Sequence, residues 1–291
     1  MRILVTGKNG QVGSELIALA GVSQHEWLCC DRSNLDISNQ ADVDRVVDDF
    51  APDVVINAAA YTAVDNAESD QDAAYAINAL GPAYLAQACQ RKGAALLHIS
   101  TDYVFAGDSA QPYVESDEVG PTGIYGASKL AGEIAIAEHC PRHIILRTAW
   151  VFGSHGNNFV KTMIRVAQTR DTLGVVADQY GAPTSAVGIA AALLNIAERV
   201  GKDDIEWGIY HYSGEPFTTW HGFAETIFAN ATERGMLPHD VTINAITTAD
   251  YPTPAQRPAN SRLDCSKIEK QFHIKPDDWK AQLEKVLDTI R

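Results

Sequence analysis

The chain has 291 residues, of which 46% are hydrophobic and 21% are charged, a size that suits one large domain or two smaller ones. Its net charge of −14, without a Lys/Arg-rich run, argues against binding to nucleic acid or to a membrane surface. Five scattered cysteines without a C-x-x-C pair favour a reducing cytoplasm over a disulfide framework or a zinc site. The chain opens on an apolar strand, so we expect no signal peptide, and no apolar run is long enough to span a membrane.

A glycine-rich turn follows the first predicted strand, at residues 3–5. Gly7, Gly10 and Gly13 form a G-x-x-G-x-x-G pattern in front of a predicted helix at residues 14–20. Glycines let the backbone approach a pyrophosphate, and the helix N-terminus offers it free N–H groups. This context favours a dinucleotide site over a plain turn between strand and helix. The other residues of the turn that we predict to contact the cofactor are Asn9, Gln11 and Val12.

The second predicted strand, at residues 25–30, ends at two residues that point to different cofactors. Asp31 lies close to the spacing of about 20 residues expected for the acid that binds the adenosine ribose of NAD. Arg32 beside it could instead bind the 2′-phosphate of NADP, so NADH and NADPH both stay open. A solvated loop is the alternative for both residues. Asp36 and Ile37 are predicted either to lie against the adenine or to begin the helix at residues 40–50.

Two further apolar runs, at residues 53–60 and 94–100, predict buried parallel strands. Ligands bind at the carboxyl ends of such strands, so the residues there are candidate cofactor contacts. They are Ala58, Ala59, Ala60 and Tyr61 after the first strand, and Ile99 at the end of the second. His98, inside the second strand, is interpreted as a core histidine. Asn78 lies in a long helix predicted near residues 70–92, and it is either satisfied in the core or supports the site.

Tyr125 and Lys129 are four residues apart, which places them on one face of a helix, one turn from each other. An ammonium beside a phenol favours the phenolate and lowers its pKa, which makes the pair a proton donor and acceptor near neutral pH. The motif alone is weak, because most chance matches are structural. Thr101 strengthens it, since a hydroxyl at the end of the strand at residues 94–100 can reach the Tyr125 hydroxyl.

Repeated alternation of strands and helices predicts an α/β fold, a Rossmann-type doubly wound parallel sheet with a smaller interleaved α/β substrate domain. We assign residues 1–152 and about 185–215 to the NAD(P)-binding domain. Residues of about 153–184 and 216–291 form the predicted substrate domain, with a cleft between the two. In the second half we expect helices at residues 186–200 and 279–290, a strand at 208–212, and a helix ending at Ala231 that is capped by Thr218.

With these motifs in hand, the chain resembles the extended short-chain dehydrogenase/reductase superfamily. More narrowly, it resembles the dTDP-4-dehydrorhamnose reductase family over nearly its whole length. The stretches that carry this resemblance are residues 7–13, 57–65, 100–105, 147–153, 158–160, 178–184 and 257–261. The last four lie outside the cofactor motifs that the superfamily shares, so they discriminate best.

The resemblance implies reduction of the 4-keto group of dTDP-4-dehydro-L-rhamnose to dTDP-L-rhamnose, the last step in making this precursor of lipopolysaccharide O-antigen. Tyr125 would give a proton to the keto oxygen while NADPH or NADH delivers hydride. Lys129 would lower the pKa of Tyr125 and hold the nicotinamide ribose, and Thr101 would hydrogen-bond the reacting oxygen. The implied substrate contacts also include Asp102, Trp150, Asn158, Phe159 and Arg257.

Other members of the superfamily are the main alternatives. Nucleotide-sugar 4,6-dehydratases carry Thr-Asp-Glu where this chain has Thr101-Asp102-Tyr103, so the base for elimination is absent. Epimerases, reductases of another 4-keto nucleotide sugar and a non-catalytic NADP-binding regulatory subunit stay open. Some members of the reductase family are described with magnesium at a dimer contact. Glu15 matches one such position but Val187 supplies no acid, so we expect no metal, and a homodimer is left open.

Overall fold

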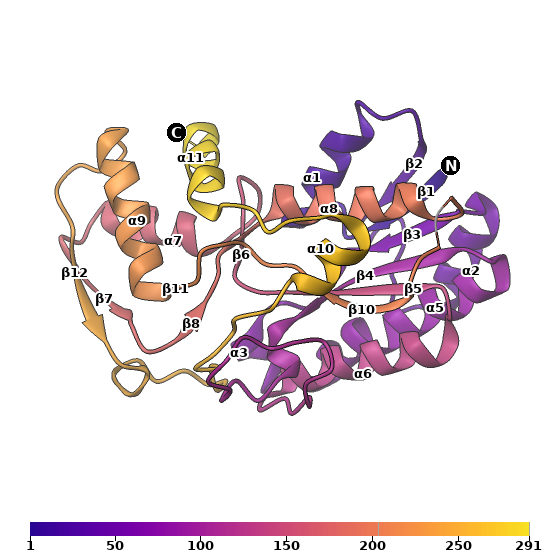
Figure 1. The fold of residues 1–291 in the computed structure, drawn as a ribbon, viewed down its shortest axis with the longest axis horizontal. Helices are drawn as coiled ribbons and strands as arrows, with labels where there is room; N and C mark the ends of the chain where they lie inside the picture. The colour runs from indigo at the N-terminus through magenta and orange to yellow at the C-terminus, as the bar shows by residue number, and fades with distance from the viewer. Residues whose placement is uncertain (203, 291) are drawn as a thin grey trace.

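A six-stranded parallel sheet forms one lobe of the computed structural model, which describes residues 1–202 and 204–290 (Figure 1). Its strands are β1 (Arg2–Thr6), β2 (Glu26–Cys30), β3 (Val54–Asn57), β4 (Ala95–Thr101), β5 (His143–Thr148) and β10 (Gly208–His211). They lie in the order β10-β5-β4-β3-β1-β2, all parallel. The strand order reverses between β1 and β3, and ligands bind at such a switch point in open α/β sheets. The doubly wound parallel sheet predicted from the sequence is confirmed.

Helices cover both faces of this sheet because successive strand residues point to opposite sides. Ile3 and Val5 of β1 pack in one core with α1 (Gln11–Ala20), α8 (Ala186–Arg199) and α10 (Ser266–Phe272). Leu4 packs in a second core with α2 (Gln40–Phe50), α5 (Gly81–Lys92) and α6 (Ile124–His139). The helices are therefore held by apolar residues that alternate along the same strand.

The long helix predicted near residues 70–92 is interrupted. It consists of α4 (Gln71–Tyr75), a π-helical turn η1 (Ala76–Leu80) and α5, and the short helix α3 (Val64–Ala67) precedes it. Asn78 lies buried in the π-helical turn, donates to the Ser128 hydroxyl at 3.1 Å, and exchanges hydrogen bonds with the backbone of Tyr61 at 2.8 and 3.0 Å. The polar residue noted in the sequence thus ties the loop after β3 to α6.

The second lobe is built around α7 (Phe159–Ala167), α9 (Trp220–Glu233) and α11 (Trp279–Ile290), with the parallel pair β7 (Thr172–Val176) and β12 (Thr242–Ile246) (Figure 1). Short pairs join it to the sheet lobe, namely β6 (Val151–Phe152) with β9 (Thr184–Ser185) and β8 (Tyr180–Gly181) with β11 (Thr218–Thr219). The helix α9 is capped by Thr219, whose hydroxyl accepts from Gly222 N at 3.1 Å. The prediction of Thr218 as the cap is wrong by one residue, because α9 begins at Trp220 and its N-cap is Thr219.

The division into two interleaved domains stays a prediction. Helix α8 and strand β10, within residues 185–215, lie in the sheet lobe. Helix α10 also packs there, through Ile268 and Phe272, so the C-terminal segment returns to the sheet before it ends in α11 of the other lobe.

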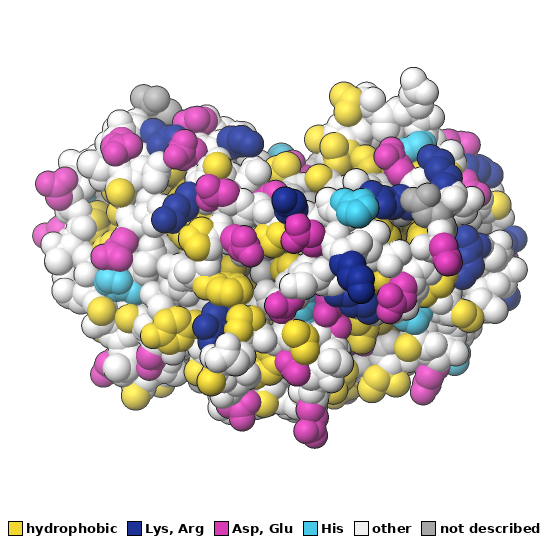
Figure 2. Space-filling model, viewed as in Figure 1, with side chains coloured by type: hydrophobic (Ala, Val, Ile, Leu, Met, Phe, Trp, Pro, Cys, Tyr) yellow, Lys and Arg dark blue, Asp and Glu magenta, His cyan; other side chains and the backbone are white. Residues whose placement is uncertain are grey.

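Acidic and basic side chains are interspersed over the face of the molecule shown in Figure 2. Among the described helices, none combines the length and apolar character needed to cross a bilayer.

Candidate active site

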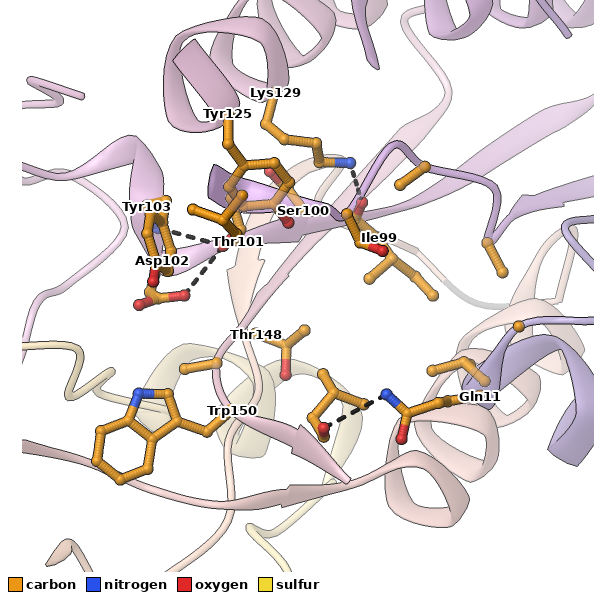
Figure 3. Close-up of a pocket in the computed structure, with 18 of the residues that line it drawn as sticks. Gln11, Ile99, Ser100, Thr101, Asp102, Tyr103, Tyr125, Lys129, Thr148 and Trp150 are labelled. Carbon is orange, nitrogen blue, oxygen red and sulfur yellow. Dashed lines mark hydrogen bonds between the residues drawn. The ribbon is translucent and has the colours of Figure 1, made fainter. Parts of the chain in front are cut away.

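A cleft of about 520 Å³ lies at the carboxyl ends of β3, β4 and β5 (Figure 3). It brings together these residues predicted from the sequence: Gly10, Gln11, Val12, Ala58, Ala59, Ala60, Ile99, Thr101, Asp102, Tyr125, Lys129 and Trp150. These residues are spread over most of the first half of the chain. The sheet gathers them because parallel strands end at one edge.

A second hollow of about 300 Å³ continues from the cleft over the glycine turn. It is lined by the remaining candidates for the adenosine end of a dinucleotide: Gly7, Asn9, Asp31, Arg32, Asp36 and Ile37. The two cavities share Gly10 and the loop at Ala58–60, so they form one elongated trough. Asp31 accepts from Lys8 Nζ at 3.0 Å and from the Ser33 hydroxyl at 2.6 Å, while Arg32 lies 79% exposed beside it.

From the first turns of α6, Tyr125 extends toward Thr101 at the end of β4, and Lys129 extends toward Ile99 of the same strand (Figure 3). Burial raises the pKa of the Tyr125 phenol above its usual value, and a hydrogen bond with Thr101 opposes this rise. The predicted lowering of this pKa by Lys129 is therefore wrong for the structure. Lys129 Nζ points to Ile99 O, at 2.6 Å, and to His98 Nε2, at 3.1 Å, instead of to the phenol.

Two buried groups in the cleft have pKa values shifted toward neutrality. Burial lowers the pKa of Lys129 to about 8, against the opposing attraction of Glu133. Burial raises the pKa of Asp102 to about 6, and hydrogen bonds from Ser261 and Thr101 oppose this rise. Ionisable groups with such shifts in a cleft are typical of sites that move protons.

Three buried polar atoms that line the cleft have no hydrogen-bond partner among the described residues: Ser100 Oγ, Asp102 Oδ2 and Thr148 Oγ1. A buried polar atom without a partner costs free energy, so these three indicate contacts made to a bound molecule. Ser100, Thr148 and Tyr103 line the cleft and were missed by the sequence reasoning. The position of Thr148 at the carboxyl end of β5 was a signal that could have found it.

Trp150 lies across the cleft from Tyr125 (Figure 3). Its backbone has a left-handed φ of 50°, and its indole stacks on Trp220 with 3.8 Å between ring centroids. A Cβ at Gly181 would lie 2.6 Å from this indole, so the loop after β7 closes directly on the ring. Left-handed backbone is costly for a bulky residue and is found where the surrounding structure enforces it, often at functional sites.

Some predicted residues lie behind the lining instead of in it. Asn158 caps α7 and donates to Gln11 Oε1 at 3.0 Å, while Phe159 packs on Trp220. Gly13 lies against the turn, where an added Cβ would be 2.1 Å from Gly7 O.

Arg257 lies on the segment between β12 and α10 and contacts two residues beside the cleft. It pairs with Asp65 at 2.7 Å and hydrogen-bonds Tyr103, which does line the cleft. Its Nη1 is buried and has no partner within the described part of the chain.

Tyr61 also lies outside the lining of the cleft, because its backbone is held by Asn78 and its hydroxyl donates to Asp70 at 3.2 Å. We therefore interpret Tyr61 as a support of the loop at 58–60.

Comparison with known proteins identifies the family of the chain. The family model described as RmlD substrate binding domain matches residues 1–291. The chain is 48% identical to the dTDP-4-dehydrorhamnose reductase of Aggregatibacter actinomycetemcomitans, over 98% of each chain. The chain belongs to the dTDP-4-dehydrorhamnose reductase family. The crystal structure of a dTDP-4-dehydrorhamnose reductase from Clostridium acetobutylicum superposes with a TM-score of 0.92 at 40% identity, over 99% of each chain. That of the Bacillus anthracis reductase, in complex with NADP, gives 0.91 at 36% identity over 99% of this chain and 98% of the other.

In this member of the dTDP-4-dehydrorhamnose reductase family, the described residues contain no group of three or more His, Cys, Asp or Glu placed to hold a metal ion. Glu15 instead accepts from the Ser154 hydroxyl at 3.4 Å and lies 4.0 Å from His155 Nε2. These contacts link α1 to the loop that follows β6.

Proposed function

We propose that this protein reduces the 4-keto group of dTDP-4-dehydro-L-rhamnose to give dTDP-L-rhamnose, with NADPH or NADH as the reductant. One observation carries the proposal. Thr101, Tyr125 and Lys129 line the same cleft, and this cleft is continuous with the hollow over the glycine turn. The family of reductases to which the chain belongs and the NADP in the Bacillus anthracis relative support it. A homodimer and a cytoplasmic location stay predictions.

The glycine turn fits a dinucleotide. A Cβ at Gly7 would lie 2.6 Å from the backbone at Ala58 and Ala59, so only glycine allows β1 and β3 to approach this closely. The first residue of α1 is Gln11, and its N-cap Gly10 offers no side-chain hydrogen bond. The free N–H groups there can hold a pyrophosphate, as helix N-termini do. When bound, the cofactor supplies the hydride.

The protein's own residues supply the proton. As hydride reaches C4, the keto oxygen gains negative charge, and a positioned hydroxyl pair stabilises it. Burial keeps the Tyr125 phenol protonated, which is the form that can donate a proton to this oxygen. Thr101 orients the phenol, and the unpartnered oxygen of Asp102 is free to accept from a sugar hydroxyl. Lys129 is aligned by Ile99 O so that it can contact the cofactor ribose.

The test is the decay of nicotinamide absorbance with enzyme, NADPH and freshly made dTDP-4-dehydro-L-rhamnose, repeated with NADH. We expect oxidation that depends on the sugar and yields dTDP-L-rhamnose. The Tyr125→Phe variant should bind NADPH as before and lose most turnover, because the phenyl ring keeps the packing and removes the proton. Tyr84→Phe, at a partly buried tyrosine of α5, is the matched control and should keep its activity. Cofactor binding without turnover in the wild type would instead favour another keto-sugar or a regulatory subunit.

A further inference from the structure

A buried series of hydrogen bonds runs from the loop after β3 to the end of Lys129. Asn57 Nδ2 lies 2.9 Å from His98 Nδ1, and His98 Nε2 lies 3.1 Å from Lys129 Nζ. All three residues are at most 2% exposed. We call this series the Asn57–His98–Lys129 network. His98 is buried, as expected from the sequence for a core histidine, and its contact with Lys129 gives it a further role.

The direction of the hydrogen bonds is set at Asn57. Its Oδ1 accepts from the backbone N–H of Ala59 at 3.2 Å and from the Thr6 hydroxyl at 2.6 Å. A backbone N–H can only donate, so this contact fixes which end of the amide is the oxygen. Asn57 Nδ2 then faces His98 and must donate to it. His98 Nδ1 is therefore the acceptor nitrogen of the ring.

The same constraint reaches Lys129. A neutral imidazole with an acceptor at Nδ1 carries its hydrogen on Nε2. His98 is held neutral, because burial lowers its pKa well below the usual value. His98 Nε2–H thus points at Lys129 Nζ. An ammonium has only donors and would face this N–H unfavourably, whereas an amine can accept from it and still donate to Ile99 O at 2.6 Å.

We propose that His98 is a positioning residue whose Nε2–H, fixed through Asn57 and the Ala59 N–H, favours the amine form of Lys129. The role of Lys129 toward the reacting phenol rests on the proposed function. The protonation state of Lys129 itself does not depend on that function. The titratable groups that act on Lys129 or share the cleft with it are His98 from β4, Tyr125 and Glu133 from α6, and Asp102 and Tyr103 from η2 (Asp102–Val104). Arg147 from β5 is paired with Glu133.

Among these side chains, His98 hydrogen-bonds the end of Lys129 directly. Glu133 favours the ammonium, but it is engaged by Arg147 in a buried pair at 2.6 Å. Burial of Lys129 acts in the same direction as His98 and lowers its pKa to about 8. A lysine with a pKa of about 8 changes charge just above neutral pH. It holds less positive charge beside Tyr125 than a solvated lysine would.

The first measurement is the tautomer of His98 in the wild-type protein, read from nitrogen chemical shifts of ¹⁵N-histidine-labelled protein and assigned with His98→Gln. We expect hydrogen on Nε2 and none on Nδ1. Hydrogen on Nδ1 would overturn the proposal, because Nε2 would then accept from an ammonium. This measurement needs no substrate, and the His98→Gln variant serves only to assign the signal.

The second measurement is the titration of Lys129, followed by the ¹³Cε shift of labelled lysine and assigned with Lys129→Met. In His98→Gln the amide can turn its oxygen to Nζ, so the pKa of Lys129 should rise by about one to two units. His143→Gln is the matched control, since this buried histidine of β5 bonds the Cys140 carbonyl and should leave the titration unchanged.

Two outcomes would contradict the inference. One is a wild-type Lys129 that titrates near the usual lysine value of about 10.4. The other is a His98→Gln variant that is folded, by circular dichroism, and titrates as the wild type does. An enzyme that lacks sugar-dependent turnover and still shows the Nε2–H tautomer and the shifted titration would refute the proposed function alone.

Discussion

Asp102→Asn should make the protein more stable at alkaline pH. Burial raises the pKa of Asp102 from 3.8 to about 6, so the folded state holds its proton more tightly than the unfolded state does. Stability therefore falls as pH rises from about 4 through 6, and above that range the buried carboxylate carries its full cost. A shift of about two units corresponds to about 3 kcal/mol, because each unit is worth about 1.4 kcal/mol. Asparagine keeps the shape and cannot ionise.

The assay is urea unfolding of wild type and Asp102→Asn at pH 4 and pH 8. The variant should gain about 3 kcal/mol relative to wild type at pH 8 and less than about 1 kcal/mol at pH 4. Altered hydrogen bonds to Thr101 and Ser261 add an offset that is the same at both pH values. Asp171→Asn, at an exposed aspartate before β7, should show no such change. A difference between wild type and Asp102→Asn that does not vary with pH would refute the reasoning.

Three further predictions test the fold and the cofactor site. Glu133→Gln leaves the buried charge of Arg147 unpaired, so the free energy of unfolding in urea should fall by about 3–5 kcal/mol. The control Glu138→Gln, at an exposed position of the same helix, should lower it by less than about 0.5 kcal/mol. Equal losses in the two variants would contradict this prediction. Arg32→Ala should weaken NADPH binding more than NADH binding in calorimetry, and equal effects would show that Arg32 does not contact the 2′-phosphate. Gly13→Ala places a Cβ 2.1 Å from a carbonyl oxygen of the turn, so both cofactors should bind more weakly in the same assay.

The sequence was most informative where one local signal decides the structure. The apolar runs before Gly7 and around Val55 are too short and too apolar for surface helices, and they form the buried strands β1 and β3. The helical spacing of Tyr125 and Lys129 places both on the cleft side of α6. These features follow from residue types within a few positions of each other, so no knowledge of the rest of the fold was needed.

The features that escaped prediction depend on contacts between distant segments. The π-helical turn at Asn78 exists because that side chain bonds the Tyr61 backbone and the Ser128 hydroxyl, which are 17 and 50 residues away. The place of Arg257 beside the cleft likewise depends on Asp65, 192 residues away in sequence. No periodicity or motif encodes such pairs. Thr218 was expected as the cap and Thr219 is the cap, because adjacent threonines offer the same side chain and the sequence does not say at which of them the helix begins.

The error over the pKa of Tyr125 has a single physical cause. Helical spacing brings Lys129 near the phenol, but it does not say where the flexible end of the lysine points. Ile99 O and His98 Nε2, both from β4, hold that end away from the phenol. With Lys129 Nζ held there, burial dominates and raises the pKa of Tyr125. The phenol therefore stays protonated, which is the form from which a reductase transfers its proton to the substrate.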